Sequence, residues 1–277
     1  MSPVIHRTLS LLVVGAAVAG IAAAAYARAD RAGRASDAAR ADSEERALQP
    51  IRADSFTGYA SIAELLANVG PGKPYCEVIE ASRLALDGRV TYEGHQTVRV
   101  DQPAGSSGIA RLTTCFASRN FWFRIKLRFS PGWTTAGSNA SSANSFKLFG
   151  WWWGEGDGRG DLEITNTTQY QLHFGPQFGG AQFVSVDAGT VTSEWSDGGW
   201  YDYVIHYQVA GNATRTRWWW ARDGQTPVLR ATALGAVPAT AQGVGFPFYF
   251  NQTLRAPQSL WIGRWEVVDG GEPWEVR

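Results

Sequence analysis

The segment 121–129 alternates apolar and mostly polar residues without interruption. One set is Phe121, Phe123, Ile125, Leu127 and Phe129, and the other is Trp122, Arg124, Lys126 and Arg128. Successive side chains of a β-strand point to opposite faces of a sheet, so the pattern predicts a half-buried strand with the first set on the core face. A chain built around such a strand needs a second apolar layer to cover it.

Similar short runs recur from residue 84 to residue 268, and Gly, Pro, Asn and Asp separate them. Roughly a dozen strands in about 200 residues predict one all-β domain, a two-sheet antiparallel sandwich. One short helix is expected before them, because Ser61 can cap it, Glu64 can reach back, and Gly70-Pro71 ends it. The sequence shows no internal repeat that would indicate a propeller or solenoid.

The first 55 residues precede this domain, which we assign to residues 56–277. His6 and Arg7 stand before an apolar stretch, and Ala27-Arg28-Ala29 has the form that signal peptidase recognises, so residues 1–29 are predicted to be a signal peptide. An uncleaved membrane anchor is the alternative, since the stretch approaches the ~20 residues that span a bilayer. Residues 30–55 have almost no large apolar side chain and are predicted to form a disordered or partly helical tether. The expected location is periplasmic or extracellular.

Charge and cysteine content limit the partners. The chain has 25 Lys+Arg and 25 Asp+Glu and a sequence pI near 6.9, so nucleic acid is not an expected partner. In an exported chain, Cys76 and Cys115 most simply form one disulfide. No metal site is expected. The spaced carboxylates of residues 155–161 could wrap calcium, but a glycine-rich hairpin is favoured and no cofactor is predicted.

Three stretches carry a resemblance to a known fold. They are 123–131 followed by 145–150, then 200–204 leading into 217–224, and finally 260–268. In order, they resemble the concanavalin A-like jelly roll of secreted bacterial polysaccharide lyases and laminin-G-like modules, over about residues 80–270. The resemblance implies a jelly-roll sandwich. It does not imply one activity, because this fold hosts lectins, hydrolases and lyases.

Glycoside hydrolases of this fold place two or three carboxylates on one strand, as Glu-x-Asp-x-x-Glu. The closest run in this chain is Asp161-Leu162-Glu163. A solvated strand edge is the favoured explanation of that run, and retaining hydrolysis is a minor alternative.

Lyases that cleave uronate polymers by β-elimination need a cation for the substrate carboxylate, a base and an acid. Alginate lyases of this fold supply them on Arg-x-Glu-Leu, Gln-x-His and Tyr-Phe-Lys-Ala-Gly strands. The matching stretches here are 159–163, 171–173 and 249–252, although Arg159 stands only 12 positions before Gln171 and Asn251 replaces the lysine. The resemblance implies Tyr249 as acid, His173 as base or orienter, and Gln171 beside them. Arg124 or Arg128 is expected to supply the positive charge.

Further residues are predicted to contact the sugar, because a half-exposed indole stacks on sugar rings and polar groups bind its hydroxyls. They are Trp122, Lys126, Arg128, Trp151, Trp153 and Asn251. His206 is expected to be hydrogen-bonded or solvent-facing, with a base role second. The predicted function is a secreted lyase of an acidic polysaccharide. The alternative is a non-catalytic carbohydrate-binding or adhesion module of the same fold, and an exported structural protein without a ligand is a third possibility.

Overall fold

The computed structural model describes residues 50–105, 110–134, 145–153, 158–165, 169–176, 184–190, 197–235, 240–247, 249–250 and 256–276. The predicted signal peptide and most of the predicted tether lie outside these residues. The last tether residues form strand β1 (Pro50–Asp54), which pairs with the closing strand of the domain. Ile51 packs against the core there, and this contact explains why the domain begins earlier than residue 56.

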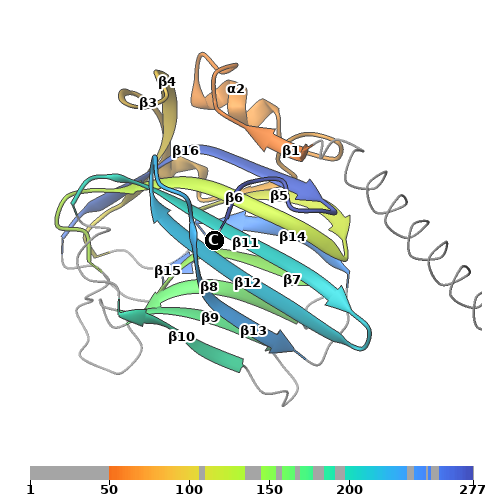
Figure 1. Cartoon of the computed structure of the whole chain (residues 1–277). Coiled ribbons are helices and arrows are strands. Elements are labelled where there is room, and N and C mark those ends of the chain that lie inside the picture. Colours follow the sequence, from red (N-terminus) through yellow and green to blue (C-terminus); the bar gives the residue numbers. More distant parts are fainter. Residues whose placement is uncertain are drawn as a thin grey trace, which may run out of the picture. The chain divides into compact units, whose positions relative to one another are not determined.

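Two antiparallel sheets, each of eight described strands, build the domain (Figure 1). Sheet 1 has the order β13 (Val228–Gly235), β12 (Ala213–Arg222), β11 (Trp200–Ala210), β6 (Asn120–Phe129), β16 (Gln258–Asp269), β4 (His95–Gln102) and β3 (Leu84–Tyr92), with β1 also on β16. Sheet 2 has the order β10 (Val184–Thr190), β9 (Gln169–Pro176), β8 (Gly158–Thr165), β7 (Ser145–Trp153), β14 (Ala241–Phe246), β5 (Arg111–Ser118) and β2 (Glu77–Ile79), with β15 (Tyr249–Phe250) also on β7.

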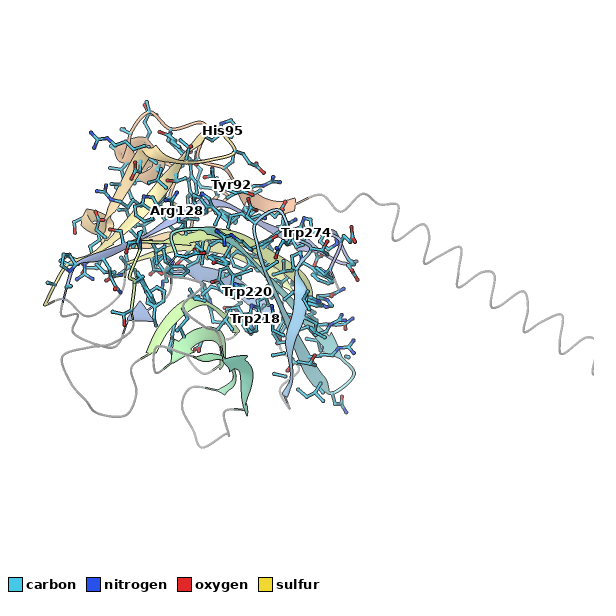
Figure 2. All side chains as sticks on the ribbon, turned by 60° about the vertical axis from the view of Figure 1, so that its left-hand side comes forward. Tyr92, His95, Arg128, Trp218, Trp220 and Trp274 are labelled. Atoms are coloured by element: carbon cyan, nitrogen blue, oxygen red, sulfur yellow. A yellow bond between two sulfur atoms is a disulfide. The ribbon has the colours of Figure 1, made fainter. Side chains whose placement is uncertain are left out.

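The core between the sheets contains the apolar set that the alternation predicts. Phe121, Phe123, Ile125, Leu127 and Phe129 are each at most 1% exposed, and Leu148 and Ile205 are fully buried with them. The side chain of Leu172, also predicted to be inward, lies outside the described residues. Trp218 and Trp220 belong to the same core, whereas Arg128 lies on the opposite face of sheet 1 (Figure 2). The all-β jelly-roll sandwich is therefore confirmed.

The predicted helix and disulfide are both present. Helix α2 (Ile62–Ala67) starts at Ser61, whose hydroxyl accepts a hydrogen bond from the Glu64 amide, while the Glu64 carboxylate accepts one from the Ala60 amide. A one-turn 3₁₀ helix, η1 (Ala81–Arg83), leads into β3. Cys76 is bonded to Cys115 with Cα atoms 5.7 Å apart, which ties the start of β2 to β5. None of the described helices is long and apolar enough to cross a bilayer.

Removing the disulfide in a Cys76→Ala/Cys115→Ala variant is expected to lower the free energy of unfolding by about 4 kcal/mol. The bond closes a loop with a sequence separation of 39 residues, and opening that loop returns chain entropy to the unfolded state. Urea denaturation of the variant and of the disulfide-bonded wild type, both without a reductant, measures the difference in the free energy of unfolding. Coincident transitions would show that the bond does not stabilise the fold.

Candidate functional site

The predicted catalytic residues are divided between the two sheets. Arg124 belongs to β6 of sheet 1, whereas Gln171 and His173 belong to β9 and Tyr249 to β15, all of sheet 2. The structure therefore does not place Arg124 on the sheet that holds Gln171, and the same is true of Lys126 and Arg128. Any cation that acts beside Gln171 has to come from another strand. Asn251 lies outside the described residues.

Sheet 2 instead has a row of polar residues across five strands. Tyr249 pairs with Lys147, Lys147 with Glu163, Glu163 with Gln171, and Gln171 with Asp187. Residues paired across neighbouring strands share one face of a sheet. We call Tyr249, Lys147, Glu163, Gln171 and Asp187 the polar row.

A second row of the same face includes Asp161, two residues before Glu163 in β8. Asp161 pairs with His173 on one side and with Gly150 on the other. The Lys147 ammonium lies 2.9 Å from an Asp161 carboxylate oxygen, and both side chains are almost completely buried. Lys147 was not among the site residues predicted from the sequence, although one lysine within the apolar stretch 146–149 was a usable signal. A buried lysine needs a carboxylate partner, and here Asp161 provides it.

The tryptophans of β7 lie on different faces. Trp151 is 1% exposed in the core, so its predicted role in stacking on sugar is wrong. Trp152 lies on the face of the polar row and is half-buried. Its ring covers Gly243 so closely that a Cβ at residue 243 would lie 2.6 Å from it. Trp152 therefore packs part of its indole against bare backbone, and the side chain of Trp153 lies outside the described residues.

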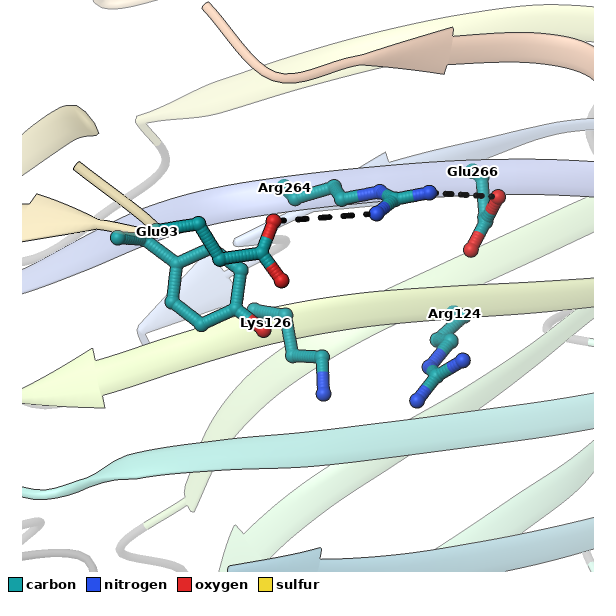
Figure 3. Close-up of a pocket in the computed structure, with 6 residues that line it drawn as sticks. Glu93, Arg124, Lys126, Arg264 and Glu266 are labelled. Carbon is teal, nitrogen blue, oxygen red and sulfur yellow. Dashed lines mark hydrogen bonds and ion pairs between the residues drawn. The ribbon is translucent and has the colours of Figure 1, made fainter. Parts of the chain in front are cut away.

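Sheet 1 contains a separate polar pocket of about 160 Å³ (Figure 3). It is formed where the tip of the β3–β4 hairpin lies over β6 and β16, and it is lined by Tyr92, Glu93, Arg124, Lys126, Arg264 and Glu266. The hairpin approaches this closely because residue 263 is glycine. A Cβ there would lie 2.6 Å from the Tyr92 Cβ atom and 3.0 Å from the Trp200 ring.

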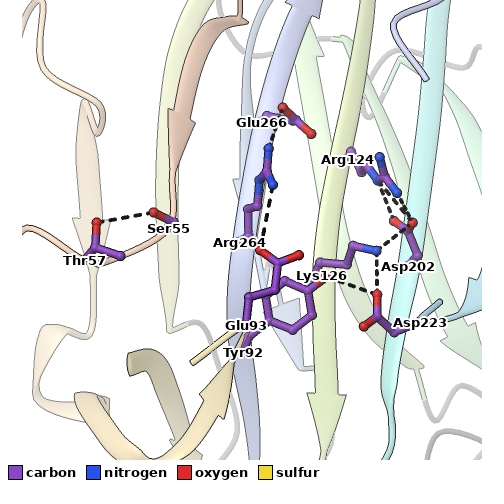
Figure 4. A network of polar contacts seen from close by, with 10 residues as sticks. All are labelled: Ser55, Thr57, Tyr92, Glu93, Arg124, Lys126, Asp202, Asp223, Arg264 and Glu266. Carbon is purple, nitrogen blue, oxygen red and sulfur yellow. Dashed lines mark hydrogen bonds and ion pairs between the residues drawn. The ribbon is translucent and has the colours of Figure 1, made fainter. Parts of the chain in front are cut away.

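The charges of this pocket are compensated within the chain (Figure 4). Arg124 and Lys126 lie 2.6 Å and 2.8 Å from the fully buried carboxylate of Asp202. Lys126 also contacts Asp223 at 2.7 Å, and the Tyr92 hydroxyl donates to the same carboxylate. Burial would raise the pKa of Asp223, but the hydrogen bond and charge of Lys126 outweigh it and lower the pKa. Burial and then the Asp223 charge raise the pKa of Tyr92. Neither Arg124 nor Lys126 is a free cation.

His206 and Trp122 form a stacked cluster on this face of sheet 1. Their rings are parallel at 4.1 Å, and Trp219 and Trp274 also contact Trp122, which is 2% exposed. Trp122 therefore offers no open face to a sugar, and its predicted binding role is wrong. The Arg217 guanidinium can only donate, so it donates to His206 Nδ1, and His206 Nε2–H donates to Asn120. Burial, and then the Arg217 and Arg215 charges, lower the pKa of His206 to about 3.

This depressed pKa predicts a pH-dependent stability. Below about pH 6.5 the unfolded chain binds a proton at His206 and the folded protein does not, so the free energy of unfolding falls as the pH decreases toward 3. The contribution is up to about 1.4 kcal/mol per pH unit. Urea denaturation between pH 4 and pH 7 should give a shallower slope for His206→Gln than for the wild type. Parallel slopes would mean that His206 titrates normally in the folded protein.

Comparison with known proteins gives likenesses of fold only. No protein-family model and no curated protein matches the chain. Among solved structures, Rv0315 of Mycobacterium tuberculosis, described as an immunostimulatory antigen and pseudo β-1,3-glucanase, is 14% identical, with a TM-score of 0.47 over 80% of this chain and 99% of that one. LamAcat of Zobellia galactanivorans is 11% identical, with a TM-score of 0.47 over 80% and 98%. The alginate lyase of Klebsiella pneumoniae is 11% identical, with a TM-score of 0.45 over 66% and 84%.

Proposed function

We propose that the protein binds a neutral polysaccharide, without cleaving it, on the face of sheet 2 that holds the polar row and Trp152. The observation that supports this most strongly is the register, which aligns five polar residues across five neighbouring strands. Hydroxyl, ammonium, carboxylate and amide groups together can both donate hydrogen bonds to sugar hydroxyls and accept them. Paired strands hold the backbone of these residues at fixed spacing, which reduces the entropy lost on binding.

Trp152 supplies the apolar part of the proposed site. Sugar rings have apolar faces that stack on indoles, and Trp152 is half-buried at the end of the same face. Its packing on the Gly243 backbone fixes the ring before a ligand arrives. A rigid indole beside a polar row is an arrangement that suits an extended glycan.

The charges on this face favour a neutral ligand. Asp161, which is opposite His173 and next to the polar row, neutralises Lys147. The paired residues of the face include two cations, Lys147 and Arg159, against three carboxylates, Asp161, Glu163 and Asp187. This gives a formal charge of −1, which disfavours a uronate polymer.

The same ion pair disfavours catalysis. β-Elimination requires a cation that is available to the substrate carboxylate, and retaining hydrolysis requires a carboxylate that is free to attack. Lys147 and Asp161 are each engaged with the other at 2.9 Å. If Lys147 contacted a substrate carboxylate in place of Asp161, the buried Asp161 carboxylate would lose its compensating charge.

Lyase activity on an acidic polysaccharide is the second candidate, and one observation favours it. The strands of Gln171, His173 and Tyr249 belong to one sheet, with Tyr249 and Gln171 in one register row. In that reaction Tyr249 would be the acid, His173 the base or orienter, and Lys147 would take the role predicted for Arg124 or Arg128. The Cys76–Cys115 disulfide supports the predicted export in either case, since disulfides persist in oxidising compartments.

Trp152→Ala is expected to weaken binding to a neutral glucan about tenfold, because it removes the stacking surface. Affinity electrophoresis of folded proteins in gels with and without soluble glucans measures the change. Trp274→Ala is the matched control, since Trp274 is also a half-buried indole and contacts Trp122 of sheet 1. Equal effects of the two substitutions, or no retardation of the wild type on any neutral glucan, would contradict the proposed site.

Incubation with a panel of uronate polymers is expected to give no ultraviolet absorbance from unsaturated uronate products. Because Lys147, the cation of the polar row, is already paired with Asp161, the wild type should behave like the buffer control. A steady increase in this absorbance that is abolished by both Tyr249→Phe and His173→Ala would contradict the binding function and support the lyase function.

A further inference from the structure

The outer face of sheet 1, opposite to the core, has an arginine between two tryptophans. Arg128 of β6 pairs with Trp200 of β11 on one side and with Trp261 of β16 on the other. Each of the three side chains is half-buried. We call these three residues the tryptophan–arginine row. The next strand of the sheet extends it by Arg99, which pairs with Trp261.

Arg128 differs from the neighbouring cations because it has no carboxylate partner among the described residues. Its Nε atom is buried without a hydrogen-bond acceptor in this part of the chain. By contrast, Arg99 lies 2.9 Å from Asp101 and 3.6 Å from Asp87, and Arg124 and Lys126 share Asp202. Among the described residues, Arg128 is thus an uncompensated positive charge of the row.

The two indoles are fixed in position beside this charge. The Arg128 guanidinium lies 5.8 Å from the centre of the Trp261 ring, and the Trp261 indole N–H donates to Asp87 at 2.9 Å. The Trp200 ring contacts Tyr92 edge-on, with ring centres 5.0 Å apart. The Trp200 ring also reaches across β6 toward β16, where a Cβ at Gly263 would lie 3.0 Å from it.

We propose that the tryptophan–arginine row binds an anionic sugar residue, whose carboxylate or sulfate group pairs with Arg128 while its ring stacks on Trp200 or Trp261. A planar guanidinium binds such anions through two parallel hydrogen bonds, and an uncompensated one gains most from a ligand charge. The site lies on the opposite sheet from the polar row and selects the opposite class of glycan. It therefore does not depend on the proposed function.

Titration of the full-length protein with polygalacturonate, dextran sulfate and uncharged dextran, followed by tryptophan fluorescence, tests this. The wild type should bind one or both of the charged polymers, and the comparison of the two identifies carboxylate or sulfate as the preferred group. Arg128→Gln should weaken that binding at least tenfold. Arg128→Lys should weaken it less, because a lysine keeps the charge and loses the two-point contact.

Arg264→Gln is the matched control, since it removes an arginine on the same face of sheet 1 whose charge is already paired with Glu93 and Glu266. It should bind the charged polymers like the wild type. Near-ultraviolet circular dichroism and thermal midpoints verify that all variants are folded. Three results would overturn the proposal: no binding of either charged polymer, unchanged binding by Arg128→Gln, or equal losses for Arg264→Gln and Arg128→Gln.

Discussion

The strict alternation of β6 is the constraint on which the rest of the structure depends. This strand lies between β11 and β16 in sheet 1, and its five apolar side chains form the centre of the core. A shift of its register by one residue would turn Arg124, Lys126 and Arg128 into the core, at a cost greater than the net stability of a domain. The cations of β6 are therefore confined to the outer face of sheet 1. They cannot act on a ligand bound to the outer face of sheet 2.

Buried ion pairs decide which charges are available on each face. Asp202 in sheet 1 and Asp161 in sheet 2 are both fully buried, and each lies beside a lysine at less than 3 Å. Ions removed from water need compensation nearby, so a lysine close to such an aspartate is committed to it. Arg128 is close to indoles and to no described carboxylate. The number of cations on a face therefore overstates its capacity for an anionic ligand.

Local signals in the sequence predicted the fold better than the site. The alternation of 121–129, the cap at Ser61 and an even cysteine count each involve neighbouring residues or one possible pairing, and all three were confirmed. The site depends on which strands become neighbours, and this does not follow from alternation. Arg124 could thus be expected beside Gln171 although they belong to different sheets. The faces of Trp151 and Trp152 were equally undetermined, because three consecutive tryptophans fit either register.

A sandwich has two outer faces, and each strand contributes side chains to only one of them. The polar row uses β15, β7, β8, β9 and β10, whereas the tryptophan–arginine row uses β11, β6 and β16, so the two rows have no strand in common. Between them lies a packed aromatic core, where Phe123 of sheet 1 contacts Phe149 and Phe246 of sheet 2. Close packing resists small displacements, so substitutions at the surface of one face should leave the other in place. The two faces can therefore differ in charge and in ligand within one domain.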